Sequence, residues 1–347
     1  MTAAQPGVLR GGWGVLGVAL AAGWLVAGCS GSSGVGPSIT LYNGQHPQTT
    51  ESLVSAFEKA TGITVNVRND DEDTLADEIV SEGSRSPADV IYTENSPALA
   101  YLQGKGLLAP VDPPTLADTP GRYDSAQGDW VGVSARVSVL IYNPSLIAES
   151  QLPTAILQLA DPRYQGELAL APGETDFQPI VTSVARAYGS AAALTWLEGL
   201  KTNAGSRIYP DDETIADEVN RGAAAFGIVN QYYWYRMGSE LGASNVHSKI
   251  AHLAPHDPGY VLDVSGAAVL RSSKQQAAAQ RFLAFLVSQQ GQEIIARSTS
   301  YEYPIASGVA TAQPETPFAD LQPNSITISE LGDGSTAISL MQQAGLL

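Results

Sequence analysis

Short apolar runs alternate with helical patterns along most of the chain. Residues 39–42 form an apolar run, and Leu53, Val54 and Phe57 lie at helical spacing within residues 49–60, which Gly62 closes. The same criteria predict strands at residues 63–67, 88–92, 130–133, 137–142, 207–209, 224–229 and 266–270, and helices at residues 75–80 (ended by Gly83), 179–188, 191–200, 214–221 and around 282–286. Such alternation predicts an α/β fold with mainly parallel sheets flanked by helices. Two series of these units predict two lobes with a ligand cleft and a hinge between them.

The N-terminal segment has the pattern of a bacterial leader. Residues 1–28 contain one ionisable side chain, Arg10, and an apolar run at residues 13–27 that is too short for a comfortable bilayer span. The run ends in Val26-Ala27-Gly28-Cys29, which resembles a lipoprotein cleavage box. We therefore predict a signal peptide at residues 1–28, a lipidated Cys29 and a flexible Gly- and Ser-rich tether over residues 29–38. A plain secretory peptide or short anchor with an incidental cysteine is the alternative.

Composition restricts the classes of partner. The 347 residues include 35 acidic and 18 basic side chains, for a formal charge of -17. A field of this sign repels phosphate backbones, so no nucleic-acid partner is expected. The single cysteine, Cys29, excludes a disulfide within the chain. The sequence contains no G-x-S-x-G, H-E-x-x-H or Walker pattern, and we expect that the protein is not an enzyme.

A cluster of aromatic residues offers the first candidate chemistry. Tyr232 and Tyr233 open the run Tyr-Tyr-Trp-Tyr directly after the predicted strand at residues 224–229. A phenol with an ordinary pKa near 10 loses its proton at neutral pH only to a strongly charged, hard cation, and ferric iron is one. Neighbouring residues of a strand point to opposite sides, so both phenols can face one ion only from a turn or a helix start. The alternative is an aromatic cluster packed on a helix or lining a sugar site.

Several segments together resemble one protein family. They are Tyr42-Asn43-Gly44-Gln45-His46, Pro87-Ala88-Asp89-Val90-Ile91-Tyr92-Thr93-Glu94, Gly106-Leu107-Leu108-Ala109-Pro110, Tyr232-Tyr233-Trp234-Tyr235, His256-Asp257-Pro258-Gly259 and Ser265-Gly266-Ala267-Ala268-Val269-Leu270. From Ile39 to Leu347 the chain is similar to the bacterial ferric-ion-binding proteins, which are type 2 periplasmic binding proteins. The resemblance implies the two-lobed fold of that class, with lobe 1 at residues 39–137 plus 264–314 and lobe 2 at residues 138–263 plus 315–347.

The resemblance also implies a set of iron ligands. It assigns Fe(III) coordination to His46, Glu94, Tyr232 and Tyr233. One carboxylate and two phenolates would supply up to three negative charges against the ion, so neutralisation would be complete or nearly so. His46 and Glu94 fall in lobe 1 and the tyrosines in lobe 2, so binding is expected to draw the lobes together.

The family completes the iron shell with a synergistic anion such as carbonate or phosphate, and here the sequence departs from its pattern. The corresponding turn, residues 173–177, carries Glu174 and Asp176, which would repel phosphate unless they point away and only backbone N–H groups face the site. The candidate anion-binding residues are Asn95, Arg136, Thr175 and Asn230. For Arg136, a surface or lobe-closing salt bridge is an equal alternative.

The resemblance implies a role in transport. The protein would take Fe(III) from ferric chelates outside the cytoplasm and deliver it to an ABC permease and its ATPase. It would be periplasmic or held at the outer face of the cell membrane by lipidated Cys29, and we expect a monomer.

Other interpretations stay open. One is a binding protein of the same fold for a polyamine or an oxyanion, and another is a structural or sensory lipoprotein. His247, His252 and His256 superficially suggest zinc, but Pro255 disrupts helical presentation of the last two, and loop or surface positions are expected.

Overall fold

The computed structural model describes residues 36–306, 308–311 and 316–347. The predicted signal peptide, Cys29 and most of the predicted tether lie outside the described residues. Within the described part of the chain, no helix combines the length and the apolar character needed to cross a membrane.

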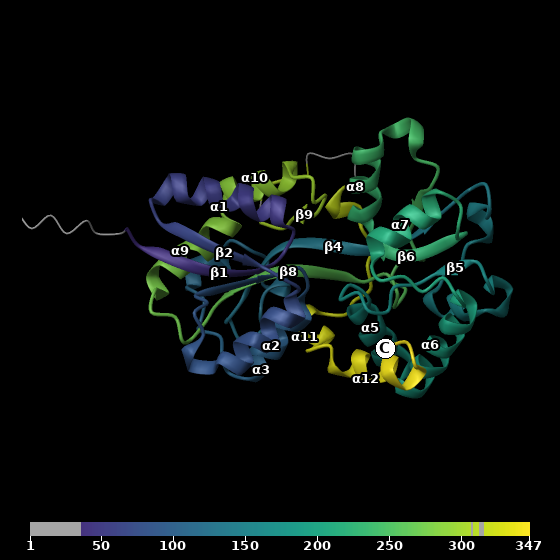
Figure 1. The fold of residues 1–347 in the computed structure, drawn as a ribbon, viewed down its shortest axis with the longest axis horizontal. Helices are drawn as coiled ribbons and strands as arrows, with labels where there is room; N and C mark the ends of the chain where they lie inside the picture. Colours follow the sequence, from purple (N-terminus) through teal and green to yellow (C-terminus); the bar gives the residue numbers. More distant parts are fainter. Residues whose placement is uncertain (1–35, 307, 312–315) are drawn as a thin grey trace, which may run out of the picture. The chain divides into compact units, whose positions relative to one another are not determined.

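A mixed β-sheet organises the described residues (Figure 1). Its strands are β1 (Ser38–Gly44), β2 (Thr64–Asn69), β3 (Val90–Thr93), β4 (Val131–Tyr142), β5 (Leu168–Ala169), β6 (Phe226–Asn230), β7 (Lys249–Ala251), β8 (Leu262–Val269) and β9 (Tyr303–Pro304). Their order is β2-β1-β3-β8-β4-β6-β5, and β7 and β9 also pair with β4. β1 is parallel to β2 and β3, and β5 is parallel to β6, whereas β8 and β4 pair antiparallel to their neighbours. The two crossing strands thus add antiparallel pairing to the parallel units that the alternation predicts.

β4 connects the two halves of this sheet. The prediction of separate strands at residues 130–133 and 137–142 is wrong, because one strand runs through Val131–Tyr142 with a register shift between Gly132 and Ser134. Up to Val137 it pairs with β8, and from Ser138 onward it pairs with β6. The apolar pattern breaks at Ser134 and Arg136, yet both are fully buried because each has a polar partner in the interior.

The helices flank the sheet. They are α1 (Pro47–Thr61), α2 (Glu72–Glu82), α3 (Ser96–Gly104), α4 (Pro113–Ala117), α5 (Phe177–Tyr188), α6 (Ser190–Ala204), α7 (Asp212–Asn220), α8 (Gln231–Leu241), α9 (Gln276–Val287), α10 (Gln289–Arg297), α11 (Ile328–Leu331) and α12 (Ser335–Ala344). The predicted stops are confirmed, since Gly62 and Gly83 follow α1 and α2 with φ of +69° and +56°. Only glycine adopts such angles without steric cost.

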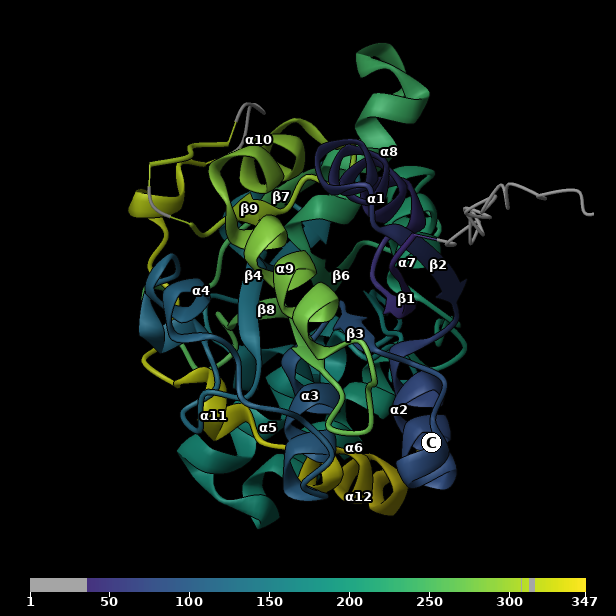
Figure 2. The same ribbon diagram turned by 90° about the vertical axis from the view of Figure 1, so that its left-hand side faces the viewer.

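Two apolar cores hold the strands β2, β1, β3, β8 and β4 between helices. Leu53 and Phe57 of α1 pack with Phe282 and Leu286 of α9 against one face. On the opposite face, the apolar side chains of α2 and α3 join a larger core that continues beneath β6. Figure 2 shows α1, α9 and α10 on one side of these strands and α2 and α3 on the other. The strand ends between these layers are therefore fixed by packing on both faces.

Some elements differ from the prediction. Residues 207–209 form no strand, because only a single bridge joins Ile208 to Leu170. The sequence pattern predicts no element at α4, which begins at Pro113. The prediction that the adjacent phenols lie in a turn or at a helix start is confirmed, because β6 ends at Asn230 and α8 begins at Gln231.

Candidate metal centre

The sheet register brings the first two predicted ligands together. β1 and β3 are parallel neighbours in which Gly44 pairs with Thr93. His46 lies two residues beyond Gly44, at the start of α1, and Glu94 follows Thr93 directly. Because parallel strands end at the same edge of a sheet, both side chains emerge at one place. The Nε2 atom of His46 lies 3.3 Å from Oε1 of Glu94.

The tyrosines enter from the other half of the sheet. Tyr232 and Tyr233 occupy the first turn of α8, with ring centroids 4.3 Å apart. The hydroxyl of Tyr232 lies 2.5 Å from Oε1 of Glu94, and its ring lies 5.0 Å from that of His46. Three predicted ligands therefore meet at one point, and the ring of the fourth, Tyr233, lies beside them.

Burial decides the protonation of these groups. It lowers the pKa of His46 to about 4, so the imidazole is neutral and has a lone pair for a cation. Burial, followed by the charge of the nearby Asp176 carboxylate, raises the pKa of Glu94 to about 7. Burial, followed by the charges of Asp176 and Glu94, raises the pKa values of Tyr232 and Tyr233 well above the usual 10. Only a highly charged cation compensates for the loss of these protons.

Arg136, which was predicted to bind an anion, forms ion pairs with carboxylates of the chain itself. Its Nη2 atom lies 2.5 Å from Oε1 of Glu302 and 3.4 Å from Oε1 of Glu94, and the side chain is buried. Glu302 also accepts hydrogen bonds from Gln45 and Ser134, at 3.3 Å and 3.2 Å. This geometry corresponds to the salt-bridge alternative for Arg136.

A second polar network fixes the segment that carries Glu94. The backbone N–H and side-chain amide of Asn95 donate to Glu72, at 2.8 Å and 3.1 Å. The same amide nitrogen lies 2.8 Å from Oδ1 of Asp176 and 3.2 Å from Oγ1 of Thr175. Asn95 therefore connects the strand-end loops of both halves. Asn230, the remaining anion candidate, is buried at the end of β6.

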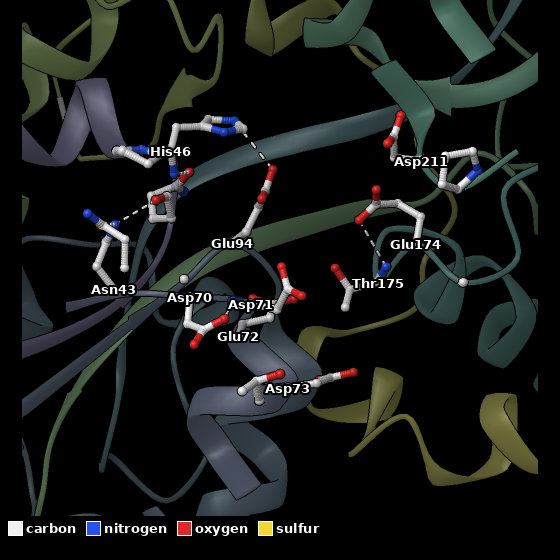
Figure 3. Close-up of a pocket in the computed structure, with 17 residues that line it drawn as sticks. Asn43, His46, Asp70, Asp71, Glu72, Asp73, Glu94, Glu174, Thr175 and Asp211 are labelled. Atoms are coloured by element: carbon white, nitrogen blue, oxygen red, sulfur yellow. Dashed lines mark hydrogen bonds and ion pairs between the residues drawn. The ribbon is translucent and has the colours of Figure 1, made fainter. Parts of the chain in front are cut away.

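A cavity of about 680 Å³ opens beside these groups. His46 and Glu94 lie on its wall, and Glu174 and Thr175 face them from the other half of the sheet (Figure 3). Tyr232 and Tyr233 are not part of its lining. The acidic residues around it are Asp70, Asp71, Glu72, Asp73, Glu94, Glu174 and Asp211. A cavity with so many carboxylates favours a cation over an anion.

The other histidines make structural contacts. His256 shares a hydrogen bond of 3.0 Å with the carbonyl oxygen of Pro323, and His252 stacks on Tyr260 at 4.9 Å. The backbone N–H of His247 donates to Asn220 at 2.7 Å. Among the residues that the structure describes, no three His, Cys, Asp or Glu side chains are grouped to hold a metal ion. The candidate centre is of another type because it includes phenols.

Sequence reasoning missed two buried residues of the site, Glu72 and Glu302. It also missed that the side chain of Asp176 points inward. No local pattern distinguishes Glu72 or Glu302 from surface acids. For Asp176 a signal existed, since an acidic residue at a turn expected to bind an anion needs an explanation.

Comparisons with known proteins agree with this architecture. The sequence model described as "Bacterial extracellular solute-binding protein" matches residues 52–320. The Fe(3+)-binding periplasmic protein of Serratia marcescens is 36% identical over 94% of this chain and 96% of its own length. The major ferric iron-binding protein of Neisseria meningitidis is 36% identical over 89% of this chain and 93% of its own.

A solved structure gives the same result. Iron-bound HitA from Pseudomonas aeruginosa superposes with a TM-score of 0.84 and 40% identity, covering 89% of this chain and 99% of its own. The chain therefore belongs to the bacterial extracellular solute-binding protein family, where it groups with the ferric-ion-binding periplasmic proteins.

Proposed function

We propose that this protein is an extracytoplasmic solute-binding lipoprotein that captures Fe(III) and delivers it to an ABC importer. The observation that carries the proposal is the meeting of His46 Nε2, Glu94 Oε1 and the Tyr232 hydroxyl within 3.3 Å and 2.5 Å contacts. The full-length likeness to proteins named for ferric binding supports the choice of ion.

The chemistry of the donor set fits a ferric cargo. The ligands would be His46, Glu94, Tyr232 and Tyr233. Nε2 of His46 is buried, and no described residue forms a hydrogen bond with it, so a lone pair is available for a cation. Two phenolates and one carboxylate match the charge and hardness of Fe(III), whereas divalent ions compete poorly for phenol protons.

Capture would couple to closure of the lobes, taken as residues 39–137 plus 264–314 and residues 138–263 plus 315–347. In the open form, the ligands from each lobe would face solvent and accept iron from a ferric chelate. The tyrosines would then lose their protons as closure buries the ion. Contacts such as Gln178 to Asp73, at 3.1 Å, and Asn95 to Asp176, at 2.8 Å, would stabilise the closed form.

Delivery would use a membrane complex. The predicted lipid on Cys29 would hold the chain at the outer face of the cell membrane, and the tether would let the closed form reach an ABC permease powered by its ATPase. A monomer suits this cycle, because closure has to proceed without hindrance from a second copy.

A visible absorption titration tests the proposal. The chain beginning at Gly31, stripped of metal, receives a ferric chelate stepwise, and a phenolate-to-iron band is expected to saturate at one iron per chain. The band should be absent in Tyr232→Phe/Tyr233→Phe and retained in Tyr235→Phe, a matched control whose ring stacks on Tyr301 at 5.9 Å. A parent protein with no band, or a double variant with the parent's band, would contradict the assignment.

A polyamine is the second candidate cargo, and the carboxylates that line the cavity favour it. Aromatic side chains near the wall would add cation–π attraction for an organic cation. This complex would be colourless, so calorimetric binding of spermidine by a protein that forms no ferric band would identify the alternative.

A further inference from the structure

We propose that Gln231 is a positioning residue whose side chain ties the start of α8, with Tyr232 and Tyr233, to the crossing between the two lobes. This inference rests on the proposed ferric function and deepens it. Gln231 binds no metal in this proposal and acts only through the helix that it begins.

The side chain of Gln231 connects two backbone groups in the interior. It is 1% exposed. Its Oε1 atom accepts a hydrogen bond of 2.8 Å from the backbone N–H of Val137, and its Nε2 atom donates one of 3.0 Å to the carbonyl oxygen of Tyr301. Because one partner is a donor and the other an acceptor, the pair matches the two ends of an amide. An apolar side chain here would deprive both buried backbone groups of these bonds.

Val137 lies where β4 passes from one half of the sheet to the other. It is the last residue of β4 that pairs with β8, and the next residue, Ser138, pairs with Asn230 of β6. A rotation of the lobes about the crossing strands would have its axis close to this point. The bond from Val137 therefore holds the start of α8 at the axis.

Tyr301 lies on the lobe 1 side of that crossing. Its segment continues into β9, which pairs with β4 before the crossing. Tyr301 has a φ of +54°, which residues other than glycine seldom adopt unless their surroundings hold them there. Two contacts from α8 reach it, the bond from Gln231 and the ring of Tyr235, which stacks on that of Tyr301 at 5.9 Å. Separation of the lobes would lengthen both contacts, whereas the bond at the axis would persist.

The start of α8 depends on this anchor. Asn230, the residue before the helix, makes no side-chain hydrogen bond that caps it. The hydroxyl of Tyr232 has to reach Glu94, at 2.5 Å. A phenol oxygen lies far from the helix axis, so a small rotation of α8 displaces it by more than the backbone itself moves. Loss of the anchor would therefore change the positions of the phenol oxygens.

The segment of Tyr301 also leads to the ligands of lobe 1. Glu302 follows Tyr301 directly and pairs with Arg136, which contacts Glu94. Gln231 thus connects the helix of the phenol ligands with the network around the carboxylate ligand. Closure would complete this connection, and the two halves of the centre would be aligned as the lobes meet.

Two buried glutamines give a matched test. Gln231→Met nearly keeps the size of the side chain and removes both hydrogen bonds. Gln280→Met is the control, because Gln280 is 8% exposed, accepts a bond of 3.1 Å from the N–H of Asp112 and donates one of 2.8 Å to the carbonyl of Pro110. All three of these residues fall in the proposed lobe 1. Both variants should lower the Tm of the metal-free protein by similar amounts, since each loses two buried hydrogen bonds.

Ferric binding should distinguish the two variants. In competition with nitrilotriacetate, Gln231→Met should lose about 10- to 100-fold in affinity, as loss of a group that orients metal ligands does, and Gln280→Met should stay within about twofold of the parent. At saturating iron, the phenolate-to-iron band should shift in wavelength in Gln231→Met and coincide with the parent's in Gln280→Met. A residue that only stabilises the fold would lower the Tm without moving the band.

The outcomes separate positioning from folding. The parent's affinity and band in Gln231→Met would overturn the inference, as would equal losses of affinity in the two variants. If Gln231→Met does not fold, Gln231→Asn keeps an amide that is one carbon too short for both partners, and the same loss and shift are expected. If neither variant folds, Gln231 serves folding and the inference is wrong. A parent that forms no ferric band would overturn the proposed function itself.

Discussion

Replacing Glu302 by glutamine is expected to destabilise the metal-free protein by about 3 kcal/mol, at the lower end of the cost of breaking a buried ion pair. Glu302 is 1% exposed, and its Oε1 atom lies 2.5 Å from Nη2 of Arg136. Glutamine has nearly the same volume and still forms hydrogen bonds, so the loss reports on charge. The estimate is at the low end because Glu94 remains 3.4 Å from the same guanidinium nitrogen.

Thermal and urea unfolding measure this change. For a chain of this length, about 3 kcal/mol corresponds to a fall in Tm of roughly 5 °C or somewhat more. Glu293→Gln is the control, because Glu293 is 41% exposed in its side chain and lies 3.9 Å from Arg297, also on α10. The loss there should stay below about 0.5 kcal/mol.

The reasoning fails if Glu302→Gln unfolds within about 1 kcal/mol of the parent, since a buried guanidinium without its partner would then cost nothing. A double variant, Arg136→Met/Glu302→Leu, separates charge from packing. It should be more stable than Glu302→Gln because no buried guanidinium is left without its main partner. A double variant at least as unstable as the single one would assign the loss to packing and hydrogen bonds instead.

Three further predictions concern the centre. Tyr233→Phe should weaken ferric binding more than Glu94→Ala, because water or an anion can replace a carboxylate; equal losses in chelator competition would refute this ranking. Above the pKa of Glu94, about 7, ferric affinity should fall about 100-fold per pH unit on acidification, since binding displaces the protons of two phenols, and Tyr232→Phe should show a slope lower by about one proton. Burial, then the charges of Asp176 and Glu94, raises the pKa of Glu174 to about 8. The metal-free protein should therefore lose stability as pH rises from about 4.5 to 8. Glu174→Gln should flatten this dependence in thermal unfolding, and an unchanged dependence would mean that the Glu174 carboxyl ionises without cost in the folded protein.

The sequence pattern predicted how the two phenols could face one ion, whereas the meeting of His46 with Glu94 was implied only by the family resemblance. Adjacent phenols require a turn or a helix start, and α8 begins at Gln231. Segments that follow β1 and β3 converge because parallel neighbours end at one edge, where Gly44 pairs with Thr93. The helix start is a matter of local geometry, which a short stretch of sequence contains, whereas the convergence depends on strand pairing that only the fold shows.

The positions of the buried polar residues depended on partners far away in the chain. Asp176 turns inward because it meets Asn95, 81 residues earlier, and Tyr232, 56 residues later. β4 was divided into two predicted strands because Arg136 interrupts its apolar pattern, and the residue that permits its burial, Glu302, lies 166 positions away. Buried polar residues are stable only with such partners, so they cannot be recognised before the fold is known.

The same buried acids give the centre a means of selecting its cargo. Closing the site without a cation places Glu94 and Asp176 against a single phenol proton, and it buries both tyrosines with raised pKa values. A ligand shifts closure only by as much as it favours the closed form over the open one. The attraction of a trivalent ion for its ligands offsets the free energy needed to remove the phenol protons and to bring the carboxylates together, whereas a divalent ion offsets less of each. Closure itself would therefore discriminate by charge, and a permease that recognises the closed form would receive mainly loaded protein.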